Sequence, residues 1–581
     1  MLDSSYLLEY SKIFEEQPKS FSSYLSGLGI DKIVDICSNF LSLRPNHPEV
    51  VNYQELIFNW FSQDNIEFRE YVFSKINQID QILKRNIQII NVYCIYQLFE
   101  YSIEKLPPST SLSISGLEVP LFKTILCLNE EFNTREKIVL KSTENVESTI
   151  DLYSKGITQF LCYFDLSVYD LRELILTQFV KSYLLFRFLE DYNEGTRNIL
   201  QRFLIDYGIS DWKDYLRRLI KFTHGLISPD REGYLTVSIV DDDKNNSTLN
   251  FFNKIIVDET ISYDDLDFIK LREKPIYKID EKKYRVISPL FLCEKIYQGL
   301  FFQLNDINRQ IGKERISNIS EDFRGFYCSK FTEEYLLYNI IERVFPRKFI
   351  KYSGKSLREK GITGEPDYYV RNGTKVFLFE SKDVLLNKGI KQSNDFHQIE
   401  QGLKEKFYEY KKNGEIRKLG VFQLIENVKR ILREENDFDK PNVKTVRIYP
   451  ILIVYHNVFN TPGINGLVNH WFKVELKNLQ NEGINIDCVH DLVFIDFNIF
   501  ILYHELFKSS RLRLEELLED YIDITKRNEP PLSSKPLRKR YFDSIVPFSM
   551  YVSNLVDRKG FGKSMGIFYE LGMTLVDVKP N

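Results

Sequence analysis

Apolar residues recur every three or four positions along roughly the first 225 residues of the chain. The stretches YLLEYSKIFEEQ, DKIVDICSNFLSL and LRELILTQFVKSYLLFRFLEDY show this spacing most clearly. Such spacing places apolar side chains on one face of an α-helix. We therefore predict a large, mostly α-helical N-terminal region, residues 1–320, with an internal linker at residues 105–116, where prolines and serines gather.

The pattern changes briefly near the end of this region. Residues 274–289, KPIYKIDEKKYRVISP, contain two short runs of β-branched and aromatic residues on either side of a charged segment. Such a pattern is typical of a β-hairpin, with Asp280, Glu281 and Lys282 at its tip. Helical spacing returns directly afterwards.

From about residue 325 onward, helical and strand patterns alternate. The expected helices are FTEEYLLYNIIERVF, which ends before Pro346, DFHQIEQGLKEKFYEYKK and LIENVKRILREE. The expected strands are EPDYYV, KVFLFES, VRIYPILIVYH and DLVFIDF. Short apolar strands between helices predict an α/β domain with a small, buried mixed sheet over residues 325–530. Residues 531–581 form a basic and then apolar tail, which we expect to pack on this domain.

Composition narrows the class of protein. The chain has 581 residues, of which 43% are hydrophobic, and a net charge of −4, so any nucleic-acid-binding surface must be local. Its seven cysteines form no CxxC pair and its seven histidines no HxxxH or HExxH spacing, which argues against disulfide and zinc sites. The first residues lack a signal peptide's apolar segment, and no apolar run reaches about 18 residues. We therefore expect a cytoplasmic protein without a membrane span.

The segment GEPDYYVRNGTKVFLFESKD, residues 364–383, combines a strong turn signal with charged residues. Asn372 and Gly373 form the dipeptide that most often makes a two-residue hairpin turn. With these two residues as the turn, Asp367 lies opposite Leu378 on the second strand.

Side chains alternate between the two faces of a strand, so Asp367, Glu380 and Lys382 then share one face. Asp367 and Glu380 become diagonal neighbours, roughly 7–8 Å apart at the backbone. Two carboxylates this close repel each other, and a bound divalent cation relieves the repulsion. Oxygen ligands favour Mg²⁺, for which Mn²⁺ can substitute. With Lys382 placed to orient water or to offset phosphate charge, the group suits phosphodiester hydrolysis.

Pro366-Asp367 followed by Glu380-Ser381-Lys382 resembles the PD-(D/E)XK nuclease superfamily, which has the restriction-endonuclease-like fold. The predicted helix, hairpin and helix occur in that family's order over roughly residues 325–460. The resemblance implies a metal-dependent endonuclease that acts on DNA rather than RNA. It implies that Asp367, Glu380 and the backbone carbonyl of Ser381 bind Mg²⁺. By analogy, a bacterial member with a large helical region suits restriction or phage defence.

Many members of this family add a metal-binding glutamate near the start of the first helix. Glu334 is our preferred candidate, because it precedes Leu337 and Ile341 by three and seven residues, on the apolar stripe of the expected helix. Glu333 is the alternative.

Some members also place polar residues after the lysine to contact the phosphate. Gln401, Lys404 and Tyr408 share a helical face and are candidates for such contacts, with Gln398 as a second choice. Basic residues that could bind the nucleic-acid backbone flank the site, in residues 346–361 and at Lys388 and Lys391.

Two other interpretations remain open. One is a module on a nuclease fold that binds nucleic acid without cleaving it. The other is a helical scaffold or sensor protein in which the hairpin charges are structural. Residues 1–320 carry no catalytic pattern and are available for self-association or for docking a partner protein.

Overall fold

The structure is a computed structural model. It describes residues 6–575, except 44–51, 85, 110–111, 144–145, 147, 168, 228–232, 239–246, 258–266, 314–321, 413 and 529–537. Residues 110–111 of the predicted linker, and residues 531–537 and 576–581 of the predicted tail, therefore lie outside the described part of the chain.

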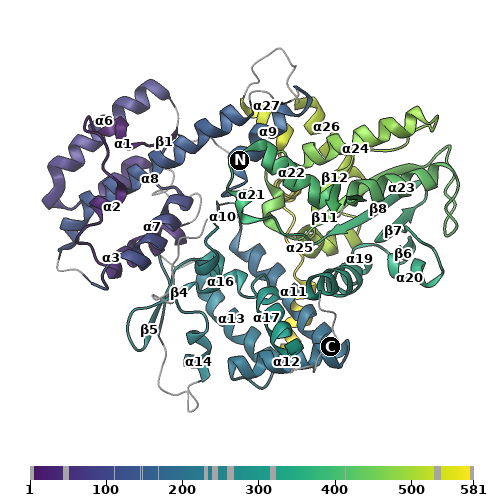
Figure 1. The fold of residues 1–581 in the computed structure, drawn as a ribbon, viewed down its shortest axis with the longest axis horizontal. Helices are drawn as coiled ribbons and strands as arrows, with labels where there is room; N and C mark the ends of the chain where they lie inside the picture. Colours follow the sequence, from purple (N-terminus) through teal and green to yellow (C-terminus); the bar gives the residue numbers. More distant parts are fainter. Residues whose placement is uncertain are drawn as a thin grey trace. The chain divides into compact units, whose positions relative to one another are not determined.

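The chain forms two compact units, and each contains separate stretches of the sequence (Figure 1). Unit 1 comprises residues 1–138, 166–178 and 202–302, and unit 2 comprises residues 139–165, 179–201 and 303–581. We expected a single boundary near residue 320. The division differs because residues 139–165 and 179–201 pack with the C-terminal part of the chain.

Unit 1 is mostly helical, as predicted. Its helices, some of which continue into unit 2, are α1 (Tyr10–Ile13), α2 (Phe21–Tyr24), α3 (Ile30–Ser42), α5 (Tyr53–Trp60), η1 (Gln63–Asn65), α6 (Ile66–Leu83), α7 (Val92–Lys105), α8 (Ile114–Ser142), α10 (Phe164–Ser167), α11 (Leu171–Asp191), α12 (Glu194–Tyr207), α13 (Trp212–Ile227), α14 (Ser247–Asn253), α15 (Ile269–Glu273), α16 (Pro289–Glu294) and α17 (Leu300–Lys313). The helices α7 and α8 enclose the predicted linker, whose last three residues are helical.

Two small sheets complete unit 1. Strands β1 (Tyr6–Leu7) and β2 (Ile87–Gln88) pair in parallel. The hairpin predicted for residues 274–289 is present as β4 (Ile276–Lys278) and β5 (Lys283–Val286), and β3 (Thr236–Ser238) extends it to three antiparallel strands.

Unit 2 is built around a five-stranded mixed sheet. In sequence order its elements are α9 (Ser148–Phe160), α18 (Phe323–Phe326), η2 (Tyr327–Leu337), α19 (Tyr338–Val344), β6 (Ile350–Ser353), α20 (Gly354–Glu359), β7 (Tyr368–Asn372), β8 (Lys375–Lys382), α21 (Lys388–Lys391), α22 (Phe396–Phe407), β9 (Glu409–Lys412), β10 (Glu415–Lys418), α23 (Gly420–Leu432), β11 (Arg447–Val454), η3 (Asn457–Asn460), α24 (Ile464–Asn481), β12 (Val493–Asp496), α25 (Asn498–Lys508), α26 (Leu514–Asn528), α27 (Arg538–Ile545), α28 (Phe548–Arg558) and α29 (Gly566–Leu575).

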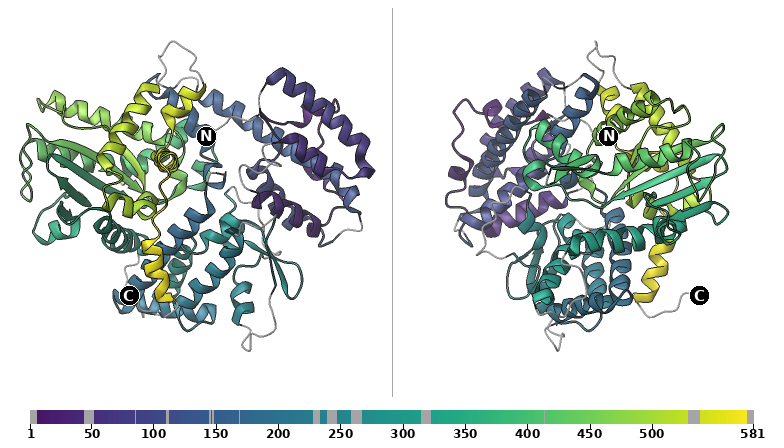
Figure 2. Two further views of the ribbon diagram at one scale, coloured as in Figure 1. Left: turned by 180° about the vertical axis from the view of Figure 1, so that it is seen from behind. Right: turned by 45° about the vertical axis from the view of Figure 1, so that its right-hand side comes forward.

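The strand order of this sheet is β12-β11-β8-β7-β6. Strands β6, β7 and β8 are antiparallel, whereas β8, β11 and β12 run parallel. Helices cover both faces (Figure 1, Figure 2). Val376 and Leu378 pack with α9, α22, α23 and α24, and Phe377 and Phe379 contact aromatic rings that follow α19 or belong to α25. Because helices cover both faces of the sheet, β8 carries apolar side chains on both of its faces.

Two predicted helices differ from those observed. The helix expected at residues 395–412 ends at Phe407, and β9 and β10 follow it as a separate antiparallel pair. The helix expected at residues 331–345 starts earlier, and its Tyr327–Leu337 part is a π-helix. In the tail, α27 packs against α9 and α26, and α28 packs against β12. None of the helices described for this chain is both long and apolar enough to span a membrane.

Candidate active site

The β7–β8 hairpin brings the predicted charged residues to one end of the sheet. Its turn is Gly373-Thr374, because Asn372 pairs with Lys375, and Gly373 has the positive φ of 61° that favours glycine. The predicted register, which placed the turn at Asn372-Gly373 and Asp367 opposite Leu378, is therefore wrong by two residues.

An error of two residues leaves every side chain on its predicted face. Tyr368 pairs with Phe379, so the next position outward places Asp367 directly opposite Glu380 rather than diagonal to it. Asp367, Glu380 and Lys382 still share one face, as the sequence predicted.

Glu380 is completely buried at the end of β8. Its Oε1 accepts a hydrogen bond from Lys382 Nζ at 2.7 Å, and its Oε2 is buried without a hydrogen-bond partner among the described residues. Burial, together with the nearby charge of Asp367, raises the pKa of Glu380 to about 8. A buried carboxylate with an unsatisfied oxygen is costly in a folded protein, and such groups cluster at functional sites.

Asp367 lies just before β7, and its side chain contacts β8. Its Oδ2 accepts a hydrogen bond from the backbone N–H of Ser381 at 2.7 Å. Burial raises the pKa of Asp367, although the charge of Lys382 and the Ser381 N–H oppose this effect. The role of the Ser381 carbonyl as a metal ligand stays a prediction.

Lys382 is held between a carboxylate and an amide. Its Nζ donates to Glu380 Oε1 and, at 2.8 Å, to Oε1 of Gln423 on α23. Burial lowers the pKa of Lys382, but the charges of Glu380 and Asp367 outweigh this effect, so its pKa is raised and the ammonium stays charged at neutral pH. Sequence reasoning missed Gln423, because it interrupts a helix that otherwise reads as core.

The third carboxylate comes from η2, and the structure favours Glu333 over Glu334. Burial and the charge of Asp367 raise the pKa of Glu333 to about 7, and the charge of Glu333 in turn acts on Glu380. Glu334 instead forms ion pairs with Lys330 at 2.7 Å and with an arginine at 3.0 Å. The preference for Glu334 assumed α-helical spacing, whereas a π-helix has a wider turn that changes which side chain faces the sheet.

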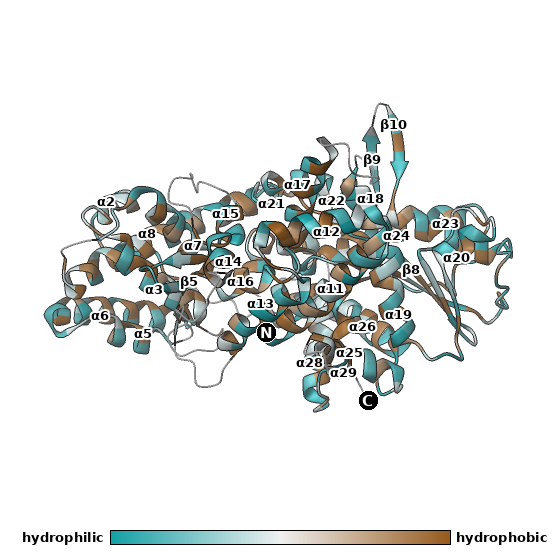
Figure 3. Ribbon diagram, turned by 90° about the horizontal axis from the view of Figure 1, so that it is seen from below, coloured by the Kyte–Doolittle hydropathy of each residue, from teal (hydrophilic) through white to brown (hydrophobic). Residues whose placement is uncertain are grey.

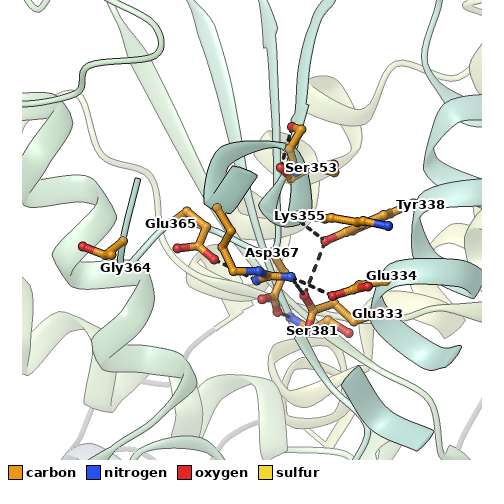
Figure 4. A network of polar contacts seen from close by, with 12 residues as sticks. Glu333, Glu334, Tyr338, Ser353, Lys355, Gly364, Glu365, Asp367 and Ser381 are labelled. Carbon is orange, nitrogen blue, oxygen red and sulfur yellow. Dashed lines mark hydrogen bonds and ion pairs between the residues drawn. The ribbon is translucent and has the colours of Figure 1, made fainter. Parts of the chain in front are cut away.

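That arginine is Arg358 on α20, within the basic segment noted at residues 346–361. Its guanidinium forms ion pairs with Glu365 at 2.7 Å, with Glu334 at 3.0 Å and with Glu333 at 3.5 Å. Figure 4 shows these carboxylates converging with Asp367. Arg358 therefore offsets part of the negative charge on the accessible side of the cluster.

Asp383, the residue after Lys382, fixes the end of β8 through the contacts of its side chain. Its carboxylate accepts hydrogen bonds from Arg324 at 2.7 Å and Thr332 at 2.8 Å, and it contacts His456 Nε2 at 3.0 Å. Burial alone would raise the pKa of Asp383, but the hydrogen bond to His456 and the charge of Arg324 hold it well below its usual range. These bonds tie the strand end to α18, η2 and the segment after β11.

The predicted substrate contacts on α22 and at Tyr408, just after it, stay predictions, and their side chains are engaged within the protein. Each has another partner: Gln398 bonds Asp395, Gln401 bonds Glu405, Lys404 bonds Glu400 and Tyr408 bonds Glu475. Lys391 is also unsuited to a substrate contact, because it is buried and forms an ion pair with Asp165 at 2.9 Å. Lys388 is exposed at the start of α21.

The donor set fits a hard divalent cation. Asp367, Glu380 and Glu333 supply oxygen atoms only, burial raises the pKa values of all three, and one oxygen of Glu380 has no hydrogen-bond partner among the described residues. Among the described residues, no three Asp, Glu, His or Cys side chains are already gathered into a metal-binding cluster.

Comparisons of this chain with protein-family models, with curated proteins and with solved structures find no match.

Proposed function

We propose that this protein is a Mg²⁺-dependent nuclease that hydrolyses phosphodiester bonds of DNA. The observation that carries the proposal is the pairing of a buried, incompletely hydrogen-bonded carboxylate, Glu380, with Asp367 and with a charged lysine, Lys382. A structural ion pair explains Glu380 Oε1, but it leaves Oε2 and the raised pKa values without a purpose.

Three carboxylates would hold the ion. Glu380 would bind through its free Oε2, Asp367 through Oδ1, which is not used by Ser381, and Glu333 after release from Arg358. A bound Mg²⁺ would stabilise charge on the phosphate and favour ionisation of an attacking water. Mn²⁺ would bind the same oxygen ligands.

The ammonium group of Lys382 is a positive charge that the protein itself, rather than the bound ion, contributes to the site. Its two hydrogen bonds, to Glu380 and Gln423, aim the ammonium group along the face that carries the carboxylates. From this position it would orient the attacking water and stabilise negative charge that develops on the phosphate. Gln423 and Glu380 fix its direction without neutralising it fully.

The test is cleavage of supercoiled and linear duplex DNA by the full chain in the presence of Mg²⁺, Mn²⁺ or EDTA. We expect cleavage that requires metal and that falls at least about 100-fold in Lys382→Ala, because a lost acid–base or electrostatic group commonly costs that much. Lys508→Ala is the matched control, since Lys508 is an exposed lysine on α25, a helix on the opposite face of the sheet. Cleavage that survives in EDTA or in Lys382→Ala would contradict the proposal.

The alternative interpretations predict other results. A module that binds without cleaving would show metal-independent DNA binding and no products. A scaffold would show neither products nor stabilisation by Mg²⁺, whereas a site that binds the ion stabilises the folded state by mass action. A cytoplasmic role in restriction or phage defence stays a prediction by analogy with the resembling family.

A further inference from the structure

Strands β9 and β10 form a two-stranded ribbon with no other strand paired to it. The register is antiparallel, from Lys418 opposite Glu409 to Glu415 opposite Lys412. Figure 3 shows the ribbon projecting away from the helices that flank it. Every residue of β10 is exposed, so the strand adds nothing to a hydrophobic core.

Basic side chains dominate this ribbon. Lys411, Arg417 and Lys418 are exposed, and Ile416 between them is 60% exposed. Within the described part of the chain, neither Lys411 nor Arg417 has an ion-pair partner. An isolated two-stranded ribbon is marginally stable by itself, so an exposed ribbon rich in unpaired cations is better explained by a polyanionic partner than by folding.

The base of the ribbon lies against the candidate catalytic lysine. The backbone N–H of Leu419 donates to the carbonyl of Tyr408 at 2.7 Å and closes the base. The next residue, Gly420, is packed so tightly that an added Cβ would lie 3.1 Å from the Phe407 carbonyl oxygen and 3.3 Å from Lys382 Cε. Gly420, two residues after the end of the ribbon at Lys418, therefore lies close to the Lys382 side chain.

Contacts of aromatic and polar side chains also fix the orientation of the residues at the base of the ribbon. Lys418 Nζ lies 4.5 Å from the centre of the Phe422 ring, and Phe422 stacks on Tyr408. Gln423, one residue further, accepts a hydrogen bond from Lys382 Nζ. A nucleic acid bound along the ribbon would thus be held in a defined position relative to Lys382.

We propose that the β9–β10 ribbon enters the major groove of double-stranded DNA and holds the duplex next to the cleavage site. This proposal rests on the proposed nuclease function and narrows its substrate class. A four-residue strand is about 13 Å long, and the major groove of B-form DNA, about 12 Å wide and 8.5 Å deep, admits a two-stranded ribbon. The major groove of A-form RNA is deep and narrow, and side chains do not read it.

The experiment compares the full-length wild type with the double variant Lys411→Ala/Arg417→Ala. Binding is measured by fluorescence anisotropy in EDTA, so that no cleavage occurs, with three probes of one sequence: duplex DNA, single-stranded DNA and duplex RNA. The control is Lys508→Ala/Arg511→Ala, which removes two exposed cations at and after α25, a helix on the opposite face of the sheet. Equal melting temperatures establish that all three proteins are folded.

We expect the ribbon variant to bind duplex DNA at least tenfold more weakly, with the control unchanged. The slope of log K against log salt should fall by about 2, because each lost phosphate contact releases about one counterion less. Unchanged duplex binding by the ribbon variant, equal losses on all three probes, or no duplex binding by the wild type would each overturn the ribbon proposal. Ribbon-dependent duplex binding without cleavage in Mg²⁺ or Mn²⁺ would support the ribbon and refute the nuclease.

Discussion

Replacing Glu380 with glutamine tests the electrostatics of the site without assuming any activity. The substitution keeps the shape of the side chain and an oxygen that can accept the hydrogen bond from Lys382, but it removes a buried negative charge. In the metal-free protein, burial and the charge of Asp367 raise the pKa of Glu380 from 4.5 to about 8.

The direction of this pKa shift determines how the stability of the folded state changes with pH. The folded state retains the proton of Glu380 to a higher pH than the unfolded state does. Stability is therefore fully present below about pH 4.5 and is lost as the pH rises through about 8. Since one pKa unit corresponds to about 1.4 kcal/mol, the ceiling for this loss is about 5 kcal/mol. Asp367 and Glu333 interact with Glu380, so the loss belongs to the coupled cluster.

Hydrogen exchange of the peptide covering residues 375–382 measures the local free energy of opening. We compare the hydrogen-exchange protection of the metal-free wild type with that of Glu380→Gln at the same pH. We expect the protection of the wild type to decrease, relative to the variant, between pH 5.5 and pH 8.5. Addition of Mg²⁺ at pH 8 should restore protection in the wild type only. Glu426→Gln removes an exposed carboxylate from α23 and should behave as the wild type. Parallel pH curves for wild type and Glu380→Gln would refute the electrostatic reasoning.

Three further predictions concern the neighbours of Glu380. Glu333→Gln should lower metal-dependent cleavage at least about 100-fold and Glu334→Gln less than about tenfold, as measured by kcat/KM on plasmid DNA, and the reverse order would restore the α-helical interpretation of η2. Gln423→Ala should slow single-turnover cleavage about tenfold with little change in DNA affinity, because it frees Lys382 Nζ from one partner, and an unchanged rate would contradict this positioning role. Asp383→Asn should destabilise unit 2 by about 3 kcal/mol, because Arg324 loses its buried counter-charge, and a denaturant midpoint equal to that of the wild type would contradict it.

The hairpin shows which features of the site local sequence can predict. The alternation of side chains along a strand made the shared face of Asp367, Glu380 and Lys382 predictable, whichever even register forms. The turn itself was misplaced because the Asn-Gly preference is statistical. Only Gly373 has the left-handed backbone that the turn requires.

The same turn signal was present, and overlooked, in the segment after α22. Asn413-Gly414 directly follows the stretch that was expected to be helical as far as Lys412, and Gly414 has a φ of 86°. Charged residues at helical spacing masked this signal, because lysine and glutamate suit an exposed helix as well as an exposed ribbon. Local propensity alone does not separate these two structures.

The chemistry of the site depends on contacts between residues that are far apart in the sequence. Gln423 contacts Lys382, which lies 41 positions earlier in the sequence, and His456 contacts Asp383, which lies 73 positions earlier. Periodicity contains no information on such pairs, and it does not reveal that η2 is a π-helix. Yet these contacts decide whether Glu380 is a solvated strand end or a buried group whose pKa is raised to about 8. Burial is therefore the step at which the predicted arrangement of charges becomes a site able to bind a cation.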